Sequence, residues 1–220
     1  VIAETIVHAE RRLPLAGESE ATRYGSAEAR IGLFDEALDE LAASPGITQA
    51  GVTSLLPLRG NFSVTVAVRE MQGDRAEELP FVETRIVSDG YFEAMGIERL
   101  AGRTFSREDG LGTPPVTVVS RGYAQRYLPD ENPLGKRIRV GLKDRPWLEV
   151  VGVVADVVHE GPGTPSPGTV YTCYRQDPGA SNLMTVVVKT EGRAQDQAVA
   201  AAEALWKVDP DLPVFSLLSM

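Results

Sequence analysis

The alternation of hydrophobic and polar residues predicts a strand at the start of the chain and a helix soon after it. Residues Val1 to Ala9 alternate with period two and are rich in β-branched side chains, which favours a strand. From Ala27 to Ser44, apolar residues recur at spacings of three and four, which indicates an amphipathic helix. The expected buried positions are Ile31, Phe34, Leu38 and Leu41. Ser44-Pro45-Gly46 ends this helix, because the residue before a proline disfavours helical geometry and glycine accepts positive φ.

The same order of elements returns at the other end of the chain. Met184 to Thr190 predicts a strand, Ala194 to Val208 a helix and Val214 to Leu218 a further strand. The residues expected on the buried face of this helix are Ala198, Ala202, Leu205 and Trp206. The repetition suggests two related strand-helix-strand half-units whose helices cover one face of a shared sheet.

The middle of the chain differs from both ends, because most of its predicted elements are strands. Three more strands are predicted there, at Ile47 to Leu55, Ser63 to Glu70 and Phe81 to Val87. From Asp89 to Pro167 the segments are short, rich in Gly and Pro and mostly strand-like. Short helices are expected around Asp89 to Met95 and Arg121 to Leu128. We interpret this region as an inserted subdomain.

Length and charge narrow the classes of function. A chain of 220 residues can bury a sufficient core without crosslinks, and its only cysteine, Cys173, cannot form an internal disulfide. We expect Cys173 to be a packed strand residue rather than a nucleophile. The formal net charge of −9 disfavours binding to nucleic acid and to anionic headgroups.

No apolar run approaches the roughly 20 residues that cross a bilayer. The most apolar stretch, Leu148 to Val158, is interrupted by Glu149 and Asp156. The start at Val1 has neither an initiator Met nor the features of a signal peptide. We therefore expect the chain to be part of something longer, so this lack of membrane segments does not describe the parent protein.

The residue types that commonly act in catalysis or metal binding do not form a predicted active site. His8 and His159 belong to no cluster with metal-ligand spacing, so no metal is expected. Gly135-Lys136 fails as a phosphate-binding loop, because Asp130 and Arg137 stand where glycine and a hydroxyl residue are needed. We expect a turn there that leads into a strand. No catalytic residue and no cofactor-binding residue is predicted.

Paired carboxylates and one apolar patch complete the candidates. The pairs Glu108-Asp109, Asp130-Glu131 and Asp209 with Asp211 lie in polar, turn-like contexts and are interpreted as solvated turns. The patch consists of Tyr91, Phe92 and Met95, and core packing is favoured over docking of a partner. Ser88 or Asp89 is expected to cap the helix that carries it.

Several short phrases occur in a fixed order and together resemble a known family. They are Val87-Ser88-Asp89-Gly90-Tyr91-Phe92, Gly102-Arg103-Thr104-Phe105, Pro133-Leu134-Gly135-Lys136 and Val151-Gly152-Val153-Val154-Ala155-Asp156-Val157. In this order they are similar to the MacB-like periplasmic core domain of FtsX-type ABC transporter permeases, over nearly the whole chain.

The resemblance implies an α+β fold. A porter-like α/β sandwich of two βαβ half-units, residues 1–88 with 167–220, would carry an inserted, mainly β, sabre-like subdomain, residues 89–166. The domain would lie on the periplasmic side of the inner membrane. It would couple cytoplasmic ATP hydrolysis to export or mechanotransmission by binding partners or substrates, and it would catalyse nothing itself.

The implied partners are parts of one transport assembly. They are the transmembrane helices of the same permease, a cytoplasmic ABC ATPase subunit or domain, a periplasmic adaptor protein in relatives that use one, and a second copy in a dimeric full-length assembly. No particular partner-binding residue is predicted. Two alternatives stay open: a free-standing periplasmic or secreted α/β adaptor or ligand-binding module, and a hydrolase built from dispersed polar groups.

Overall fold

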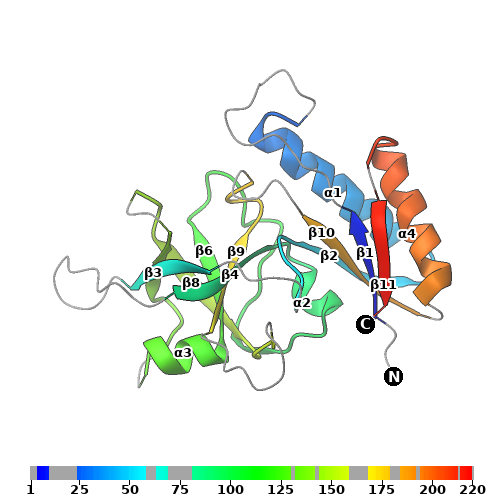
Figure 1. Cartoon of the computed structure of the whole chain (residues 1–220). Helices are drawn as coiled ribbons and strands as arrows, with labels where there is room; N and C mark the ends of the chain where they lie inside the picture. The colour runs from blue at the N-terminus through cyan, green and yellow to red at the C-terminus, as the bar shows by residue number, and fades with distance from the viewer. Residues whose placement is uncertain are drawn as a thin grey trace. The chain divides into compact units, whose positions relative to one another are not determined.

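The structure is a computed structural model with a mixed α+β fold (Figure 1). It describes residues 4–9, 24–57, 63–68, 81–129, 132–141, 144–158, 168–178, 184–191, 194–212 and 214–219. The chain divides into two compact units. Unit 1 consists of Val1–Ser54, Gly90–Gly96 and Asp177–Met220, and unit 2 of Leu55–Asp89 and Ile97–Gln176.

Unit 1 is an antiparallel sheet with two long helices. Its elements are β1 (Glu4–Ala9), α1 (Ala27–Ala43), β2 (Ile47–Thr53), α2 (Tyr91–Ala94), β10 (Thr185–Thr190), α4 (Ala194–Val208) and β11 (Val214–Ser219). The strand order is β11-β1-β10-β2, with each neighbouring pair antiparallel. Each half-unit therefore has its two strands separated by a strand of the other half-unit, the split βαβ arrangement. Helices α1 and α4 pack on each other and on this sheet, which confirms the predicted half-units.

The caps and the buried face of α1 explain its bounds. Ser26 caps its first turn by accepting a hydrogen bond from the Ala29 amide at 3.1 Å, and Gly46 beyond its end has φ of 83°. The buried residues of the helix are Arg30, Leu33, Ala37, Leu38 and Leu41. The predicted burial of Leu38 and Leu41 is confirmed. Ile31 and Phe34 are only half-buried, because the buried stripe passes through Arg30 and Leu33 instead.

Small residues determine how α4 packs. Ala198, Ala202 and Leu205 are buried as predicted. The prediction for Trp206 is wrong, because its side chain is 44% exposed. Further alanines, at positions such as Ala201, take the inward positions and allow close approach of the helix, which leaves the indole at the edge of the packed face.

Helix α2 lies directly on β2. A Cβ added to Gly51 of β2 would come within 2.5 Å of Tyr91 Cα, so only glycine permits this approach. Tyr91 and Phe92 are fully buried and pack edge to face, with ring centroids 5.6 Å apart. The predicted core role is thereby confirmed for both rings, and Met95 is half-buried.

Unit 2 is a ring of strands. Its described elements are β3 (Ser63–Val68), β4 (Phe81–Val87), β5 (Arg99–Gly102), β6 (Val116–Ser120), α3 (Arg121–Tyr127), β7 (Arg137–Val140), β8 (Leu148–Val154) and β9 (Thr169–Cys173). The order is β4-β3-β7-β8-β6-β9, and β9 pairs in parallel with β4, so these strands close on themselves. The short strand β5 pairs with the second half of β8.

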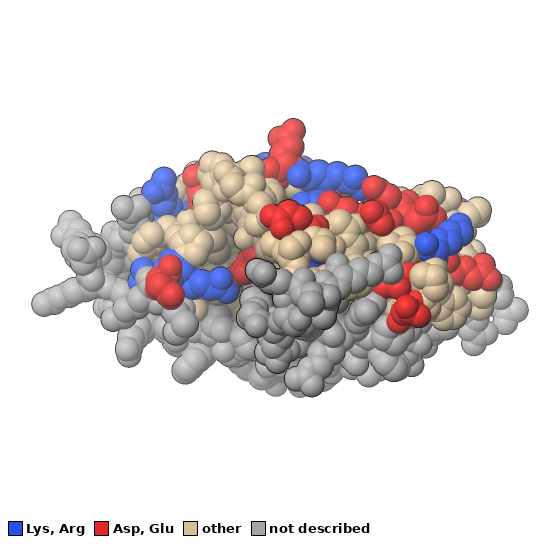
Figure 2. Space-filling view, turned by 90° about the horizontal axis from the view of Figure 1, so that it is seen from above, with Lys and Arg blue, Asp and Glu red and all other residues tan. Residues whose placement is uncertain are grey.

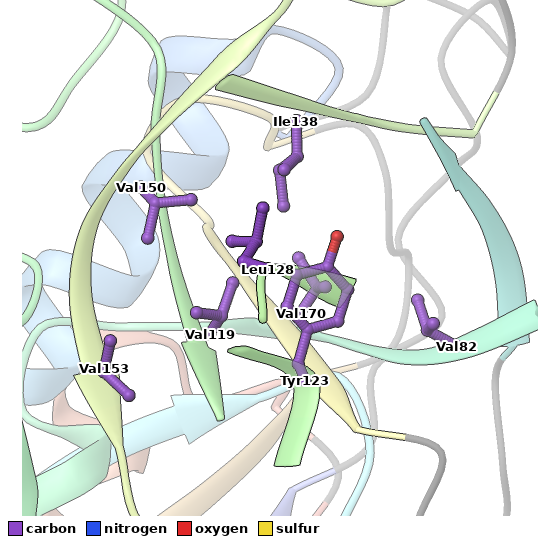
Figure 3. Packing of buried hydrophobic residues seen from close by; sticks show 8 residues of the cluster. All are labelled: Val82, Val119, Tyr123, Leu128, Ile138, Val150, Val153 and Val170. Atoms are coloured by element: carbon purple, nitrogen blue, oxygen red, sulfur yellow. The ribbon is translucent and has the colours of Figure 1, made fainter. Parts of the chain in front are cut away.

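The core of unit 2 lies inside this ring. Figure 3 shows its side chains, which are Val82, Val119, Tyr123, Leu128, Ile138, Val150, Val153 and Val170. Tyr123 and Leu128 come from α3 and the residue after it, and the others come from the strands. The Ser120 hydroxyl accepts hydrogen bonds from the amides of Tyr123, at 3.2 Å, and Thr169, at 3.0 Å. It therefore caps α3 and joins it to β9.

The compact units do not coincide with the expected subdomains. Strands β3 and β4 belong to the ring of unit 2, whereas the resemblance assigns all residues up to 88 to the porter-like part. The compact units follow spatial contacts, while the expected boundaries follow the order of phrases along the chain. The division into 1–88 with 167–220 and 89–166 stays a prediction.

Candidate functional site

The most extensive polar cluster that the structure describes surrounds Asp109, in the loop between β5 and β6. Arg103 donates two hydrogen bonds to the Asp109 carboxylate, at 2.6 and 2.8 Å. The Ser106 amide, at 2.8 Å, and hydroxyl, at 3.2 Å, donate to the same carboxylate. The side chain of Asp109 is 8% exposed, so the interpretation of Glu108-Asp109 as a solvated turn is wrong for Asp109. A buried carboxylate persists here because four donors satisfy it.

The electrostatics of this cluster follow from its contacts. Burial raises the pKa of the Asp109 carboxyl, but the hydrogen bonds from Arg103 and Ser106 together outweigh burial, so this pKa lies below its ordinary value. The hydrogen bond to Asp109 raises the pKa of Arg103 in turn. Both groups are charged at neutral pH, and a carboxylate that accepts four hydrogen bonds is a poor proton acceptor. The geometry therefore suits holding the loop in place rather than acid–base chemistry.

The same loop is anchored to the end of β9. The Cys173 thiol donates to the Asp109 carbonyl at 3.3 Å. The Gln176 side chain donates to Thr113 Oγ1, at 3.1 Å, and to the Pro114 carbonyl, at 3.0 Å. Burial raises the pKa of the Cys173 thiol to about 11, so the thiolate needed for nucleophilic attack is scarce. The prediction of Cys173 as a packed strand residue is confirmed.

A second buried carboxylate lies in unit 1, just after α4. The Tyr24 hydroxyl donates to Asp209 at 2.6 Å, and the Asp211 amide donates to the same side chain at 3.0 Å. Asp209 is 1% exposed, so the solvated-turn interpretation is wrong for it, while Asp211 is exposed as expected. These bonds connect the start of α1 to the end of α4, which is a structural role.

The remaining sequence predictions concern Asp89, Gly135, the two histidines and Asp130-Glu131. Asp89 does not cap α2, because its carboxylate lies 3.2 Å from Arg175 Nη1, and α2 has no side-chain cap. The predicted turn at Pro133 to Gly135 is confirmed, with φ of 82° at Gly135. His8 lies in β1 with its side chain outside the described part, and His159 and Asp130-Glu131 lie outside the described residues.

The described residues offer clusters that hold the fold together. Within the ranges that the structure describes, no group of three or more His, Cys, Asp or Glu side chains is placed to bind a metal ion. None of the helices in those ranges is both long and apolar enough to cross a membrane. Sequence reasoning missed the roles of Asp109 and Asp209. Arg103, six residues upstream, was a weak signal for Asp109, and no local signal connects Tyr24 to Asp209.

The charge of the chain is concentrated in one unit. By sequence, unit 1 holds 16 Asp and Glu against 7 Lys and Arg, a net charge of −9, whereas unit 2 holds 15 of each. Helix α1 carries Glu28, Glu36 and Asp39 on its exposed face, and its only cation, Arg30, is buried. Acidic side chains are accordingly prominent in Figure 2. Partners of opposite charge are thus favoured by unit 1.

The described part of the chain thus combines a split βαβ sheet in unit 1, a ring of strands in unit 2 and polar clusters that hold loops and helix ends in place. A comparison with known families identifies the chain. The family of MacB-like periplasmic core domains matches residues 14–205. The chain belongs to this family, whose members are the parts of ABC transporter permeases that lie outside the cytoplasmic membrane. No curated protein matches the sequence.

Solved structures share the fold. The periplasmic region of MacB from Actinobacillus actinomycetemcomitans is similar over 100% of this chain and 88% of its own, with 16% identity and a TM-score of 0.61. The extracellular domain of the noncanonic ABC-type transporter YknZ from Gram-positive bacteria is similar over the full length of both chains, with 19% identity and a TM-score of 0.56. Identities this low establish the fold alone.

Proposed function

We propose that this chain is the extracytoplasmic domain of an ABC transporter permease of the inner membrane. It couples cytoplasmic ATP hydrolysis to export or mechanotransmission by binding a partner or substrate, and it has no catalysis of its own. Its partners are the transmembrane helices of the same permease, the cytoplasmic ABC ATPase, a second permease copy and, where the system has one, a periplasmic adaptor. The family match over residues 14–205 carries the proposal.

The position of the first and last strands supports it. In the antiparallel pair of β1 and β11, Thr5 lies opposite Ser219. The beginning of the first strand and the end of the last strand therefore lie side by side, at one end of the unit 1 sheet (Figure 1). Two flanking membrane helices could attach at this one end and act on the same sheet.

The expected subdomains belong to the same proposal. Residues 1–88 with 167–220 would form the porter-like part and residues 89–166 the inserted part. The split βαβ sheet of unit 1 supports the porter-like assignment for the residues it contains. The strands β6 to β8 support a mainly β insertion.

Labelling of a single cysteine in the full-length permease tests the location. Val158 is 59% exposed, whereas the natural Cys173 is buried and serves as a silent background. In cells with a permeabilised outer membrane, a membrane-impermeant maleimide is expected to label Val158→Cys above the level measured for the parent protein. Labelling of Val158→Cys only after the inner membrane is broken would place the domain in the cytoplasm and refute the proposal.

The same approach tests the coupling. Cysteines placed at the exposed positions Leu111, Val158 and Val199 report on both units. In reconstituted permease with its ATPase, a non-hydrolysable ATP analogue is expected to change the labelling rate at one or more of these positions, because nucleotide-driven motion changes their surroundings. The isolated domain is the control and should not respond. Identical rates with and without nucleotide at all three positions would contradict coupling.

A further inference from the structure

The outer edge of the unit 1 sheet is formed by β11. This strand ends the order of strands, and within the described residues it pairs with β1 alone. Its sequence, Val-Phe-Ser-Leu-Leu-Ser, contains no charged residue and no proline. Proteins usually protect an edge strand with charges, proline or a bulge, since its unpaired amide and carbonyl groups are a template for another strand. The ladder between β11 and β1 shifts register at Phe215, but from Ser216 to Ser219 it is regular and has no charge or proline, so this part of the edge is suited to strand addition.

Helix α4 presents an apolar flank beside this edge. Val199 is 55% and Trp206 44% exposed, and these are the exposed large hydrophobic residues among the described part of unit 1. They are seven residues apart, so they lie on nearly the same face, about 10 Å apart along the helix axis. Three residues of an extended strand span a similar length.

The Trp206 ring is fixed relative to the start of β11. Its Nε1–H donates to the Leu212 carbonyl at 3.0 Å, and Leu212 comes two residues before the strand begins. Helix α4 also contacts β11 directly. An exposed aromatic side chain that is already held in one orientation loses little conformational entropy on binding, which is typical of an interface anchor.

Acidic side chains lie beside the surface that β11, Val199 and Trp206 form. Glu203 is exposed on α4, four residues after Val199 and three before Trp206, so it lies on the same side of the helix. Asp211 is exposed next to Leu212. The adjacent cation, Lys207, is directed toward Glu40 of α1, with 3.5 Å between Nζ and the carboxylate. With the net charge of −9 on unit 1, the surroundings favour a positively charged partner over a second copy of this chain.

We propose that the β11 edge, together with Val199 and Trp206, is a strand-addition site for an extended segment of another protein in which apolar and basic residues alternate. The backbone of the segment pairs with β11, its apolar side chains pack against Val199 and Trp206, and its cations face Glu203 and Asp211. This inference rests on the edge and its flank and does not require the proposed transport function.

A peptide titration on the isolated chain tests it. The probe is a synthetic peptide of the length of β11 that alternates lysine with valine, and the matched control peptide alternates glutamate with valine. The background variant is Trp147→Phe, so that Trp206 is the only tryptophan that fluoresces. The lysine peptide is expected to shift Trp206 emission and to slow amide hydrogen exchange along β11, with weaker binding at higher salt.

Substitutions distinguish the parts of the site. Hydrogen exchange is expected to report at least about a tenfold loss of affinity for Trp206→Ala, because aromatic anchors carry much of the binding energy. Glu203→Lys and Asp211→Lys are each expected to weaken binding about two- to fivefold, as for exposed ion pairs. Leu100→Ala changes an exposed leucine of unit 2 and is expected to leave binding unchanged.

Three results would overturn the proposal. The first is absence of binding by the lysine peptide at about 1 mM, which would mean that this chemistry is not recognised. The second is equal binding of the glutamate peptide. The third is protection of the β11 amides in the absence of peptide together with sedimentation as a dimer, which would assign the edge to a second copy.

Discussion

Removal of one phenolic oxygen is expected to have opposite effects in the two units. Tyr123 of unit 2 is fully buried in the ring core, and its hydroxyl has no hydrogen-bond partner among the described residues (Figure 3). The Tyr24 hydroxyl of unit 1 donates to the buried Asp209 carboxylate at 2.6 Å. The substitutions Tyr123→Phe and Tyr24→Phe delete the same atom from these two environments.

The magnitudes follow from the state of each hydroxyl. A buried polar group without a partner carries an uncompensated desolvation cost, so Tyr123→Phe is expected to raise the free energy of unfolding of unit 2 by about 1 kcal/mol. A hydrogen bond to a charged group contributes about 1.5–3 kcal/mol, so Tyr24→Phe is expected to lower the free energy of unfolding of unit 1 by about 2 kcal/mol. About 1 kcal/mol already corresponds to roughly a fivefold change in the unfolding equilibrium.

Urea unfolding followed by circular dichroism measures the total effect, and amide hydrogen exchange assigns it to the correct unit. The exchange measurement is needed because two compact units need not unfold in one transition. Tyr127→Phe is a matched control, since Tyr127 lies on α3 near Tyr123 and is only half-buried. A loss of stability in Tyr123→Phe equal to that in Tyr24→Phe would show that the Tyr123 hydroxyl is satisfied, and would refute the reasoning.

Three further predictions concern single residues. Because the pKa of Asp109 is below its ordinary value of 3.8, its contribution to stability is present above that pH and is lost as the pH falls below it. Asp109→Asn should lower the free energy of unfolding in urea at pH 7 by about 1–2 kcal/mol, and the stability of this variant should depend less on acid pH. An acid profile of stability equal to that of the parent protein would contradict this. Gly51→Ala should lower the free energy of unfolding by about 2 kcal/mol, because the added methyl group collides with Tyr91. Gly110→Ala is the control and should change this free energy little, since the space around Gly110 is open. Similar values for the two variants would count against the close approach of α2 to β2. Cys173 should not react with a thiol reagent at pH 8 until urea unfolds the protein, and rapid labelling of the folded chain would disprove its burial.

Local sequence patterns were sufficient to predict the helices and strands of unit 1. Periodicity alone predicts α4 with its observed bounds, because an amphipathic helix repeats its apolar residues within a few turns. The error at Trp206 has a physical cause: residues such as Ala201, Ala204 and Leu205 fill the buried face of α4, and the indole lies outside this face with 44% exposure. The pattern reports which residues are apolar, and packing decides which of them are buried.

The pairing of strands could not be predicted in the same way. The strand β10 lies between β1 and β2, and it pairs Val188 both with Thr5 and with Ala50. These pairs join residues that are far apart in the sequence, so no local window contains them. The closure of the ring in unit 2 could not be predicted locally either, since β9 and β4 pair although more than half of the unit's sequence separates them.

Polar clusters were misjudged for a related reason. Asp109 and Asp209 occur in turn-like sequences, where carboxylates are usually solvated. Their burial depends on donors that the fold supplies, such as Tyr24 for Asp209, which is 185 residues away. Composition and short spacing therefore indicate that such residues lie in turns, but they do not indicate whether a distant segment supplies a hydrogen-bond donor.

The position of β1 and β11 constrains how the proposed coupling can work. Thr5 and Ser219 lie opposite each other at one end of the strand pair, so segments that continue from both strands pull at the same end. If the two segments separate, the load falls on the hydrogen bonds at that end and opens the ladder one bond after another. If they move together, the load is shared by the whole sheet and the helices α1 and α4 packed on it. Under the proposed function, unit 1 can therefore transmit motion without unfolding only when both flanking helices move as a pair.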